Sequence, residues 1–283
     1  MNETRITVAI QGERGAFSEA AARKLLGDAI DVLPRRAFDD VFDAVVAGAA
    51  RAAMIPVENS LAGSVHRTFD LLGRAHLEIA AEVLVRIRHN LVVPPGTRRE
   101  DVRRVFSHPV ALAQCREFFA ASPELEAVEA YDTAGSVKMI VERRRGGEAA
   151  IASREAAEIW GGEILEEGIE DHDENWTRFL LLARPEDAEA MKRLVPPAPR
   201  KTTVVFRTKN VPGALFHALG AFALRSVDLT KLESRPVAGR PWEHAFYADL
   251  AGGAEEESVA NALRHLREMC EEVVVLGSYV SVS

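Results

Sequence analysis

Short apolar runs alternate with helix-like segments over the first 160 residues, and this alternation restricts the fold more than any other feature of the sequence. Strands are predicted at residues 5–10, 30–33, 52–57, 77–93, 105–107, 125–131 and 149–152, and helices at residues 18–26, 38–46, 64–72, 109–119, 133–143 and 154–160. The stretch 77–93 is interpreted as one long strand interrupted by Arg86, Arg88 and His89. Repeated strand–helix units favour a mostly parallel sheet covered by helices, so the sequence predicts an α/β fold.

Small polar loops follow three of the predicted strands, at the points where helices begin. These loops read Glu58-Asn59-Ser60, Ser107-His108-Pro109 and Asp132-Thr133-Ala134. Ligands of open α/β sheets bind at the carboxyl ends of the strands, where loop hydroxyls and helix N-terminal N–H groups are available. The sequence therefore predicts a ligand site at this edge of the sheet.

Another candidate region is the stretch 170–182, which is acidic in its first half and strand-like and apolar in its second half. Asn175, Thr177 and Arg178 stand where the loop enters that strand. An amide, a hydroxyl and a fixed cation are suitable groups for binding a small oxyanion. The alternative interpretation is a polar loop that carries a surface arginine.

Two other patterns resemble ligand sites but have simpler explanations. Four adjacent residues of the acidic half have side chains that could bind a metal ion: Asp171, His172, Asp173 and Glu174. Adjacent side chains of an extended segment point to opposite sides, so a solvated acidic turn is the default interpretation. Gly12 and Gly15 could cradle a phosphate, but the Lys-Ser/Thr pair of a P-loop does not follow them.

The sequence changes character at residues 185–200, where prolines crowd a charged stretch that has one short helical pattern at residues 186–194. This stretch is predicted to be a linker. After it, strands are predicted at residues 202–208, 229–235, 244–250 and 273–282, and helices at residues 212–225 and 255–271. The order βαββαβ is the ferredoxin-like arrangement.

Composition restricts the class of protein. The 283 residues are 47% hydrophobic and 28% charged, which is ordinary for a globular protein, and the formal net charge is −8. The acidic balance argues against broad nucleic-acid binding and leaves room for a local site for an anionic metabolite. No signal-peptide h-region and no bilayer-length apolar run is evident, so we expect a cytoplasmic protein without membrane contact.

The two cysteines, Cys115 and Cys270, both fall in predicted helices and lack metal-ligand spacing. We expect buried thiols in a reducing compartment rather than a disulfide. Cys115 lies among apolar residues, so core packing is favoured over a role as a nucleophile.

Six motifs, in this order along the chain, resemble those of the prephenate dehydratase family. The motifs are residues 12–19 (GERGAFSE), 55–65 (IPVENSLAGSV), 107–109 (SHP), 132–136 (DTAGS), 175–179 (NWTRF) and 233–236 (ESRP). Each motif alone has low specificity, but together, and followed by a βαββαβ module, they form a strong signal. The resemblance covers nearly the whole chain.

The resemblance implies a fold and a reaction. Residues 1–184 would form a two-lobed catalytic domain that resembles type 2 periplasmic binding proteins, residues 185–200 a linker, and residues 201–283 an ACT domain. The implied enzyme is a hydro-lyase that converts prephenate to phenylpyruvate without a metal or organic cofactor and is regulated by L-phenylalanine. The implied assembly is a homotetramer or at least a dimer. Arogenate as the substrate and a non-catalytic amino-acid sensor stay open as alternatives.

The resemblance also implies roles for individual residues. Thr177 would assist the leaving ring hydroxyl, and because a Thr hydroxyl is a poor acid in isolation, it must act within a hydrogen-bonded relay. Arg178 would bind the side-chain carboxylate of the substrate. The other implied substrate-binding residues are Asn59, Ser60, Ser107, Thr133 and Asn175. His108 is either a base or a helix cap, and Phe179 is expected in the core.

A phenylalanine site is implied in the ACT domain. Its residues would be Gly213, Ala214, Leu215, Glu233, Ser234 and Arg235. The first three open a predicted helix, and small residues at a helix N-terminus let backbone N–H groups approach an amino-acid carboxylate. The alternative for Gly213 is a tight turn at a helix start.

Overall fold

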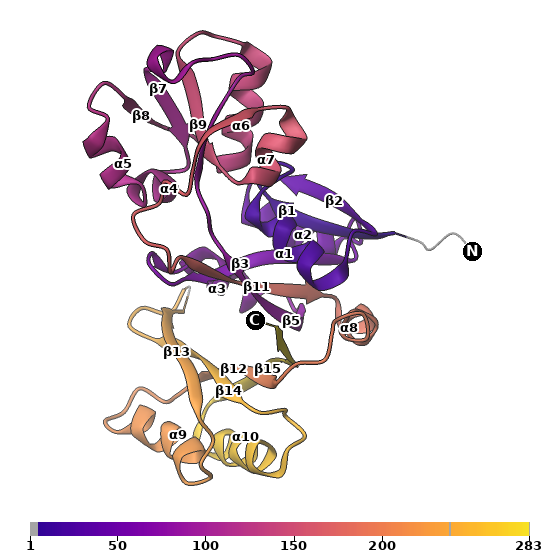
Figure 1. Ribbon diagram of the computed structural model, residues 1–283. Coiled ribbons are helices and arrows are strands. Elements are labelled where there is room, and N and C mark those ends of the chain that lie inside the picture. Colours follow the sequence, from indigo (N-terminus) through magenta and orange to yellow (C-terminus); the bar gives the residue numbers. More distant parts are fainter. Residues whose placement is uncertain (1–4, 238, 283) are drawn as a thin grey trace. The chain divides into compact units, whose positions relative to one another are not determined.

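The computed structural model describes residues 5–237 and 239–282 and divides the chain into two compact units (Figure 1). The first unit comprises Met1–Val65 and Leu84–Phe179, and the second comprises His66–Val83 and Leu180–Ser283. The chain therefore passes from one unit to the other directly after Val65, Val83 and Phe179.

The first lobe of the first unit is a mainly parallel sheet with two helices packed on it. Its elements are β1 (Ile6–Gln11), α1 (Phe17–Leu26), β2 (Ile30–Arg35), α2 (Phe38–Val46), β3 (Ala52–Asn59) and the short β4 (Gly63–Ser64). Strand β1 pairs in parallel with β2 on one side and with β3 on the other. The apolar positions of β1 and α2 meet in the core, where Val8, Ile10 and Phe42 are buried.

The second lobe of this unit is a mixed sheet surrounded by helices (Figure 1). Its elements are β6 (Asn90–Val93), η1 (Arg99–Asp101), β7 (Arg104–Ser107), α4 (Pro109–Ala113), α5 (Arg116–Ala121), β8 (Glu126–Glu129), α6 (Thr133–Arg143), β9 (Glu148–Ala152), α7 (Arg154–Trp160) and β10 (Glu163–Glu167). The strand order is β10-β6-β9-β7-β8, and β7 is parallel to both β8 and β9. The predicted α/β fold with two lobes is confirmed.

The second unit contains the predicted βαββαβ module. Its elements are α3 (His66–Leu72), most of β5 (Glu78–Arg86), the last part of β11 (Trp176–Ala183), α8 (Pro185–Lys192), β12 (Arg200–Arg207), α9 (Ala214–Ala223), β13 (Leu229–Pro236), β14 (His244–Ala251), α10 (Glu257–Met269) and β15 (Glu272–Val282). Strands β13, β14, β12 and β15 lie side by side in that order, and α9 and α10 pack together over one face. The ferredoxin-like arrangement is confirmed.

Helix α3 and most of β5 group with the C-terminal module, although they lie inside the stretch 1–184 that was predicted to be catalytic. Strand β15 pairs in parallel with β5 through Val280 and Ala81, which ties this segment to the module. Lys201 and Ser281 of the module also bond the buried carboxylate of Glu82 at 2.6 and 2.7 Å. Long-range pairing of this kind leaves no signal in the local pattern.

Three local predictions were wrong. The stretch 77–93 is two strands, because the chain leaves the first sheet after Arg86 and enters the second at Asn90. The predicted helix 109–119 breaks into α4 and α5, so Cys115 lies at the break rather than within a helix, although it is fully buried as expected. Strand β10 was not predicted.

Within the described residues, no helix is both long and apolar enough to cross a membrane.

The break between α4 and α5 has a tertiary cause. The carboxylate of Asp171 accepts hydrogen bonds from the backbone N–H groups of Arg116 and Glu117, at 3.0 and 2.9 Å. These bonds satisfy first-turn N–H groups that otherwise lack partners at a helix start. The stabilising group comes from a position 55 residues away, which explains why the local pattern indicated one continuous helix.

Candidate active site

A cavity of about 390 Å³ opens in the first unit between its two lobes. Residues at the carboxyl ends of β1, β3, β7 and β8 line it, together with the first part of β11. Asn59, Thr133 and Thr177, predicted from three separate motifs, all line this cavity, and so does His108. The fold thus gathers these residues at the edge where open α/β sheets bind ligands.

Arg178 lies on the other side of its strand. Thr177 and Phe179 line the cavity, whereas Arg178, which stands between them, does not. Its Nη1 is 2.9 Å from Oε2 of Glu58. Alternation along β11 explains this placement, since successive side chains of a strand point to opposite faces. Because Arg178 does not line the cavity, its predicted contact with a substrate carboxylate stays a prediction.

Ser60, Ser107 and Asn175 also stand outside the cavity lining and bond to the protein. The Ser60 hydroxyl donates to the carbonyl of Glu174 at 3.0 Å and accepts from the N–H of Trp176 at 3.0 Å. The fully buried Ser107 donates to the carbonyl of Ile151 at 2.7 Å. These bonds hold the strand ends that carry the cavity residues.

A network of amide side chains surrounds Thr177, and its orientation follows from two backbone groups. The N–H groups of Leu61 and Ala62 donate to Oδ1 of Asn59, at 3.0 and 2.9 Å. A backbone N–H is always a donor, so this end of the Asn59 amide is its oxygen. The Asn59 nitrogen Nδ2 therefore faces Oγ1 of Thr177 at 2.9 Å and Oδ1 of Asn175 at 2.7 Å.

This orientation determines the role of the Thr177 hydroxyl. A hydroxyl has one hydrogen and two acceptor lone pairs. Because Oγ1 of Thr177 accepts from Asn59, its own hydrogen remains available to donate into the cavity. The predicted relay around Thr177 therefore has a physical counterpart, and the hydroxyl is suited to donate a hydrogen bond to a departing oxygen.

The groups of the cavity lining that could attract an anion are neutral. No Lys or Arg is among the described residues that line it. Helices α1 and α6 begin at Phe17 and Thr133, both of which line the cavity, and the positive end of a helix favours negative charge. Burial raises the pKa of the Asp132 carboxyl, which also lines the cavity, and the hydrogen bond from the Gly135 N–H opposes that shift.

His108 caps a helix. Its Nδ1 accepts a hydrogen bond from the N–H of Val110 at 3.2 Å, at the start of α4. Burial lowers the pKa of His108, although the charges of Asp132 and Glu129 act in the opposite direction. A neutral imidazole fits the capping role, which was one of the two alternatives for this residue.

Two polar residues of the network around Thr177 were not predicted as site residues. Gln114 bonds Asn59 and Asn175, and His89 bonds Gln114. Gln114 lies in the break between α4 and α5, and His89 lies where the chain enters β6. The interruption of the stretch 77–93 by polar residues was a signal for His89, whereas an isolated Gln in a helical pattern gave none.

Residues 172–174 of the acidic stretch are exposed, as a solvated turn predicts, and the stretch is also anchored by hydrogen bonds. Asp171 caps α5, Glu170 accepts from the His89 backbone N–H at 2.8 Å, and Asp173 pairs with Arg86 at 3.1 Å. Within the described residues, no group of three or more His, Cys, Asp or Glu side chains could hold a metal ion. The stretch therefore positions the chain on both sides of the cavity.

Comparisons with known proteins identify the family. The profile described as prephenate dehydratase matches residues 8–187. The chain belongs to the prephenate dehydratase family. This membership confirms the resemblance of the motifs and makes the chain a hydro-lyase with prephenate dehydratase activity.

Relatives from plants and bacteria are similar over nearly the whole chain. Arogenate dehydratase/prephenate dehydratase 2 of Arabidopsis thaliana is 43% identical over 98% of this chain and 74% of its own length. A prephenate dehydratase from Arthrobacter aurescens, solved in complex with L-Phe, superposes with a TM-score of 0.85 at 34% identity, covering 97% of this chain and 90% of that one. A structure described as GqqA, a novel type of quorum quenching acylase, superposes with a TM-score of 0.84 at 37% identity, covering 97% and 98%.

The predicted phenylalanine-binding residues lie in two groups in the second unit. Gly213, with φ of 80°, caps α9, and Ala214 and Leu215 begin that helix. Glu233, Ser234 and Arg235 lie on β13, the outermost strand of the module. Strand β14 lies between β13 and β12, the strand that leads to α9, so one strand separates the two groups within the sheet.

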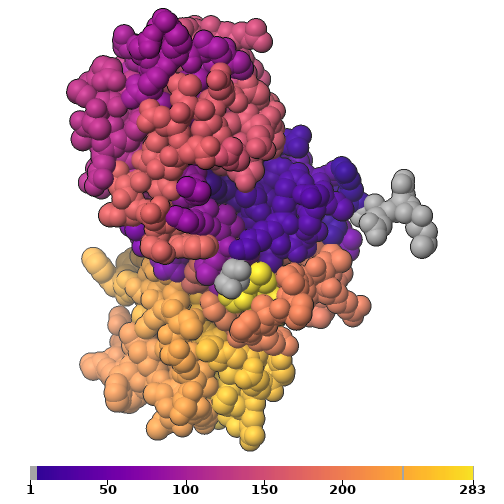
Figure 2. Space-filling model, in the orientation of Figure 1, coloured from indigo at the N-terminus to yellow at the C-terminus, as the bar shows by residue number. Residues whose placement is uncertain are grey.

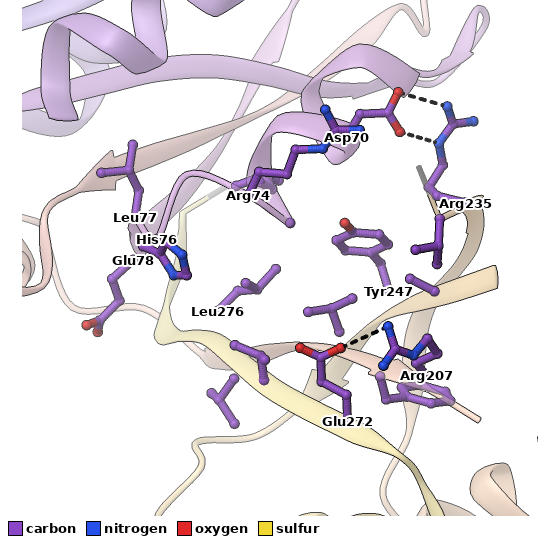
Figure 3. A pocket seen from close by; sticks show the side chains of 18 of the residues that line it. Asp70, Arg74, His76, Leu77, Glu78, Arg207, Arg235, Tyr247, Glu272 and Leu276 are labelled. Atoms are coloured by element: carbon purple, nitrogen blue, oxygen red, sulfur yellow. Dashed lines mark hydrogen bonds and ion pairs between the residues drawn. The ribbon is translucent and has the colours of Figure 1, made fainter. Parts of the chain in front are cut away.

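A second cavity, of about 570 Å³, lies in this unit on the face of the module that α9 and α10 leave open. Figure 3 shows Asp70 from α3 facing Arg235 from β13, with Tyr247 of β14 below them. Arg235 donates to both oxygens of Asp70, from Nε at 3.0 Å and from Nη2 at 3.2 Å. Arg235 is thus committed to α3, which the sequence did not indicate.

Proposed function

We propose that the prephenate dehydratase activity of this family member takes place in the cavity of the first unit, with Thr177 as the residue that donates to the leaving ring hydroxyl. The hydrogen bond from Asn59 to Thr177 carries this proposal, because it leaves the Thr177 hydrogen directed to the substrate. A positioned donor of this kind contributes roughly 10²–10⁴-fold to a rate.

Prephenate carries two carboxylates and a ring hydroxyl, and it loses water and carbon dioxide as its ring becomes aromatic. Aromatisation supplies most of the driving force. Neutral donors such as Asn59 and Thr133 suit the ring carboxylate, because a tight cationic clamp would oppose its departure as carbon dioxide. The absence of Lys and Arg from the described cavity lining supports this arrangement.

Turnover of prephenate and arogenate, measured separately with the purified chain, tests the proposed function. The two substrates differ only by an oxo or an amino group on the side chain, and the Arabidopsis relative is named for both. We expect phenylpyruvate to form from prephenate, detected by its absorbance. Turnover of neither substrate would favour a non-catalytic sensor, and a strong preference for arogenate would reassign the substrate without moving the site.

The similar structure that is described as an acylase suggests acyl transfer as a second possible reaction. The geometry around Thr177 does not favour it. An acylase that used Thr177 as its nucleophile would need a base to take the hydroxyl proton. Among the described residues, no imidazole or carboxylate hydrogen-bonds to Oγ1 of Thr177, and Asn59 donates to it instead. The same hydroxyl is well placed to act as a donor.

We also propose that L-phenylalanine binds at an interface between two copies of the second unit, in a homodimer or homotetramer. The two predicted groups of phenylalanine-binding residues are separated within one chain and would be brought together by a second copy. Large apolar side chains support an interface here: Phe216 and Leu224 are each 78% exposed, and Leu232 on the outermost strand is 43% exposed. Orange atoms of this part of the chain form much of the visible surface of the second unit (Figure 2).

A cytoplasmic location of the protein stays a prediction.

Helix α3 is the proposed route from this site to the catalytic cavity. The side chains of β13 and β14 hold it at three points: Arg235 bonds Asp70, the ammonium of Lys231 lies 5.5 Å from the centre of the Phe69 ring, and the Tyr247 hydroxyl donates to the Phe69 carbonyl at 2.9 Å. Helix α3 begins directly after residues 62–65, which line the catalytic cavity. A shift of β13 would therefore pull on a cavity segment through continuous chain.

Replacing Asp70 with Asn is expected to weaken inhibition by L-phenylalanine more than it weakens basal turnover. The substitution removes the charge that holds Arg235, and allosteric coupling is typically worth about 5- to 150-fold in affinity. We expect the half-inhibitory concentration to rise at least about fivefold, measured by initial rates. Glu243→Gln, which breaks the exposed Arg240–Glu243 pair of the same unit, is the matched control. Unchanged inhibition in Asp70→Asn would exclude this route.

A further inference from the structure

His89 is the most deeply buried titratable residue of the catalytic cavity, and its side chain is 2% exposed. It stands where the chain crosses from the first lobe to the second. Its backbone N–H donates to Oε2 of Glu170 at 2.8 Å, its carbonyl accepts from the N–H of Ile169 at 2.9 Å, and its ring meets the Phe17 ring edge-on at 5.9 Å. The imidazole is therefore held in place on several sides.

The hydrogen-bond network determines which ring nitrogen of His89 carries the proton. The Asn59 oxygen, identified by its two backbone donors, faces Gln114 at 3.2 Å, so the Gln114 atom at that contact is the nitrogen Nε2. The other end of the Gln114 amide is then its oxygen, Oε1, which lies 2.9 Å from Nε2 of His89. An amide oxygen only accepts, so His89 donates from Nε2 and is the Nε2–H tautomer.

The donors now form a single directed series. His89 donates to Gln114, Gln114 donates to Asn59, and Asn59 donates to Thr177. Hydrogen bonds that point the same way polarise one another, and the effect is strongest where water is excluded. The last member of the series is the hydroxyl that the proposed function assigns to the leaving group, and the first is His89.

The neutral state of His89 is consistent with this role. Burial lowers the pKa of His89, and the bond to Gln114 and the charge of Glu170 act in the opposite direction. A neutral imidazole with its proton on Nε2 has one donor, and that donor is used on Gln114. Among the described residues, Nδ1 of His89 has no hydrogen-bond partner. No neighbouring acceptor therefore favours the Nδ1–H tautomer.

We infer that His89 is a positioning residue for the dehydration: its Nε2–H fixes the Gln114 amide, and through Asn59 it strengthens the Thr177 hydroxyl as a hydrogen-bond donor. This inference rests on the proposed function of Thr177. His89 does not need to touch the substrate, and it should act on the chemical step more than on substrate binding.

The first test compares two amides in place of the imidazole. His89→Gln extends an amide nitrogen to about the position of Nε2 and can still donate to Gln114, whereas the shorter His89→Asn cannot reach it. We expect kcat to fall roughly 5- to 50-fold in His89→Asn with little change in KM, and His89→Gln to recover most of the loss. Equal losses in both variants, or an effect confined to KM, would overturn the inference. His172→Gln, at an exposed histidine of the same unit, is the control.

The second test asks whether His89 acts through Thr177. In a double-mutant cycle, His89→Asn should slow the parent but change the rate of Thr177→Val by less than about twofold, because the hydroxyl that it strengthens is gone. An undiminished effect in the Thr177→Val background would refute the series. If the parent chain turned over neither prephenate nor arogenate, the proposed function itself would fail. This measurement is made before the His89 variants are compared, so the two failures can be told apart.

Discussion

Replacing Thr177 with Val is expected to lower kcat for prephenate by about 10²–10⁴-fold, the usual contribution of a positioned donor to the departure of a leaving group. Valine keeps the shape and the strand preference of threonine but has no hydroxyl. Thr177 is 7% exposed and lies on β11, and the substitution removes the bond from Asn59, whose side-chain nitrogen still donates to Oδ1 of Asn175, so the fold should be retained. Steady-state rates, with circular dichroism to confirm folding, measure the effect.

Thr177→Ser is the matched control, because it keeps the hydroxyl and removes only a methyl group. We expect Ser to retain most of the activity, with a loss that reflects the greater rotational freedom of its side chain. Parental turnover by Thr177→Val would remove Thr177 from the chemistry. Loss of activity in both variants would indicate that packing of the methyl group, rather than hydrogen bonding, is what the cavity requires.

The second large effect is expected from Gly15→Ala, which should destabilise the first unit by roughly 2–5 kcal/mol. Gly15 has φ of 86°, a left-handed conformation that costs about 1–2 kcal/mol for other residues. A Cβ added there would lie 2.5 Å from Cα of Ala156 in helix α7. Backbone cannot move aside as a flexible side chain can, so the two lobes would be forced apart. Thermal or urea denaturation measures the loss.

Gly27→Ala separates the cost of the backbone conformation from the cost of the contact with Ala156. Gly27 also has a left-handed φ, 74°, but a Cβ added there meets nothing within 4 Å. Its ψ of −171° lies in a region that other residues rarely adopt, so its substitution should cost only the conformational part, about 1–3 kcal/mol. Equal destabilisation by the two substitutions would show that contact with Ala156 adds nothing. A further expectation is that Gly15→Ala, unlike Gly27→Ala, also lowers kcat, because Gly15 joins the lobes that form the catalytic cavity.

The glycine pair illustrates what local sequence patterns leave out. Gly12 and Gly15 resembled an incomplete phosphate loop, but the structure explains Gly15 as a point of close approach to Ala156 and Gly12 by its left-handed φ of 96° beside Asp132. A Cβ on Gly12 would lie 3.4 Å from the Asp132 carboxyl, and one on Gly15 would overlap Ala156. The partners lie more than a hundred residues away, so no local pattern could indicate them.

Arg178 illustrates the opposite case, in which a local rule was available. The strand after Asn175 was predicted, and alternation along a strand places Thr177 and Arg178 on opposite faces. Their adjacency in one motif nevertheless indicated a common site. The structure pairs Arg178 with Glu58 and directs Thr177 to the cavity.

The sequence by itself determined the α/β fold, the βαββαβ module, most helix and strand positions, the family, and three residues that share one cavity of the first unit. Periodicity and motif order contain this information because they depend on neighbours in the chain. Only the tertiary structure decided that Gln114 and His89 stand behind Asn59 and Thr177, that Asp171 breaks a helix, and that α3 belongs with the C-terminal module. Hydrogen bonds between distant segments fix these features, and the chemistry of each donor and acceptor has meaning only once its partner is in place.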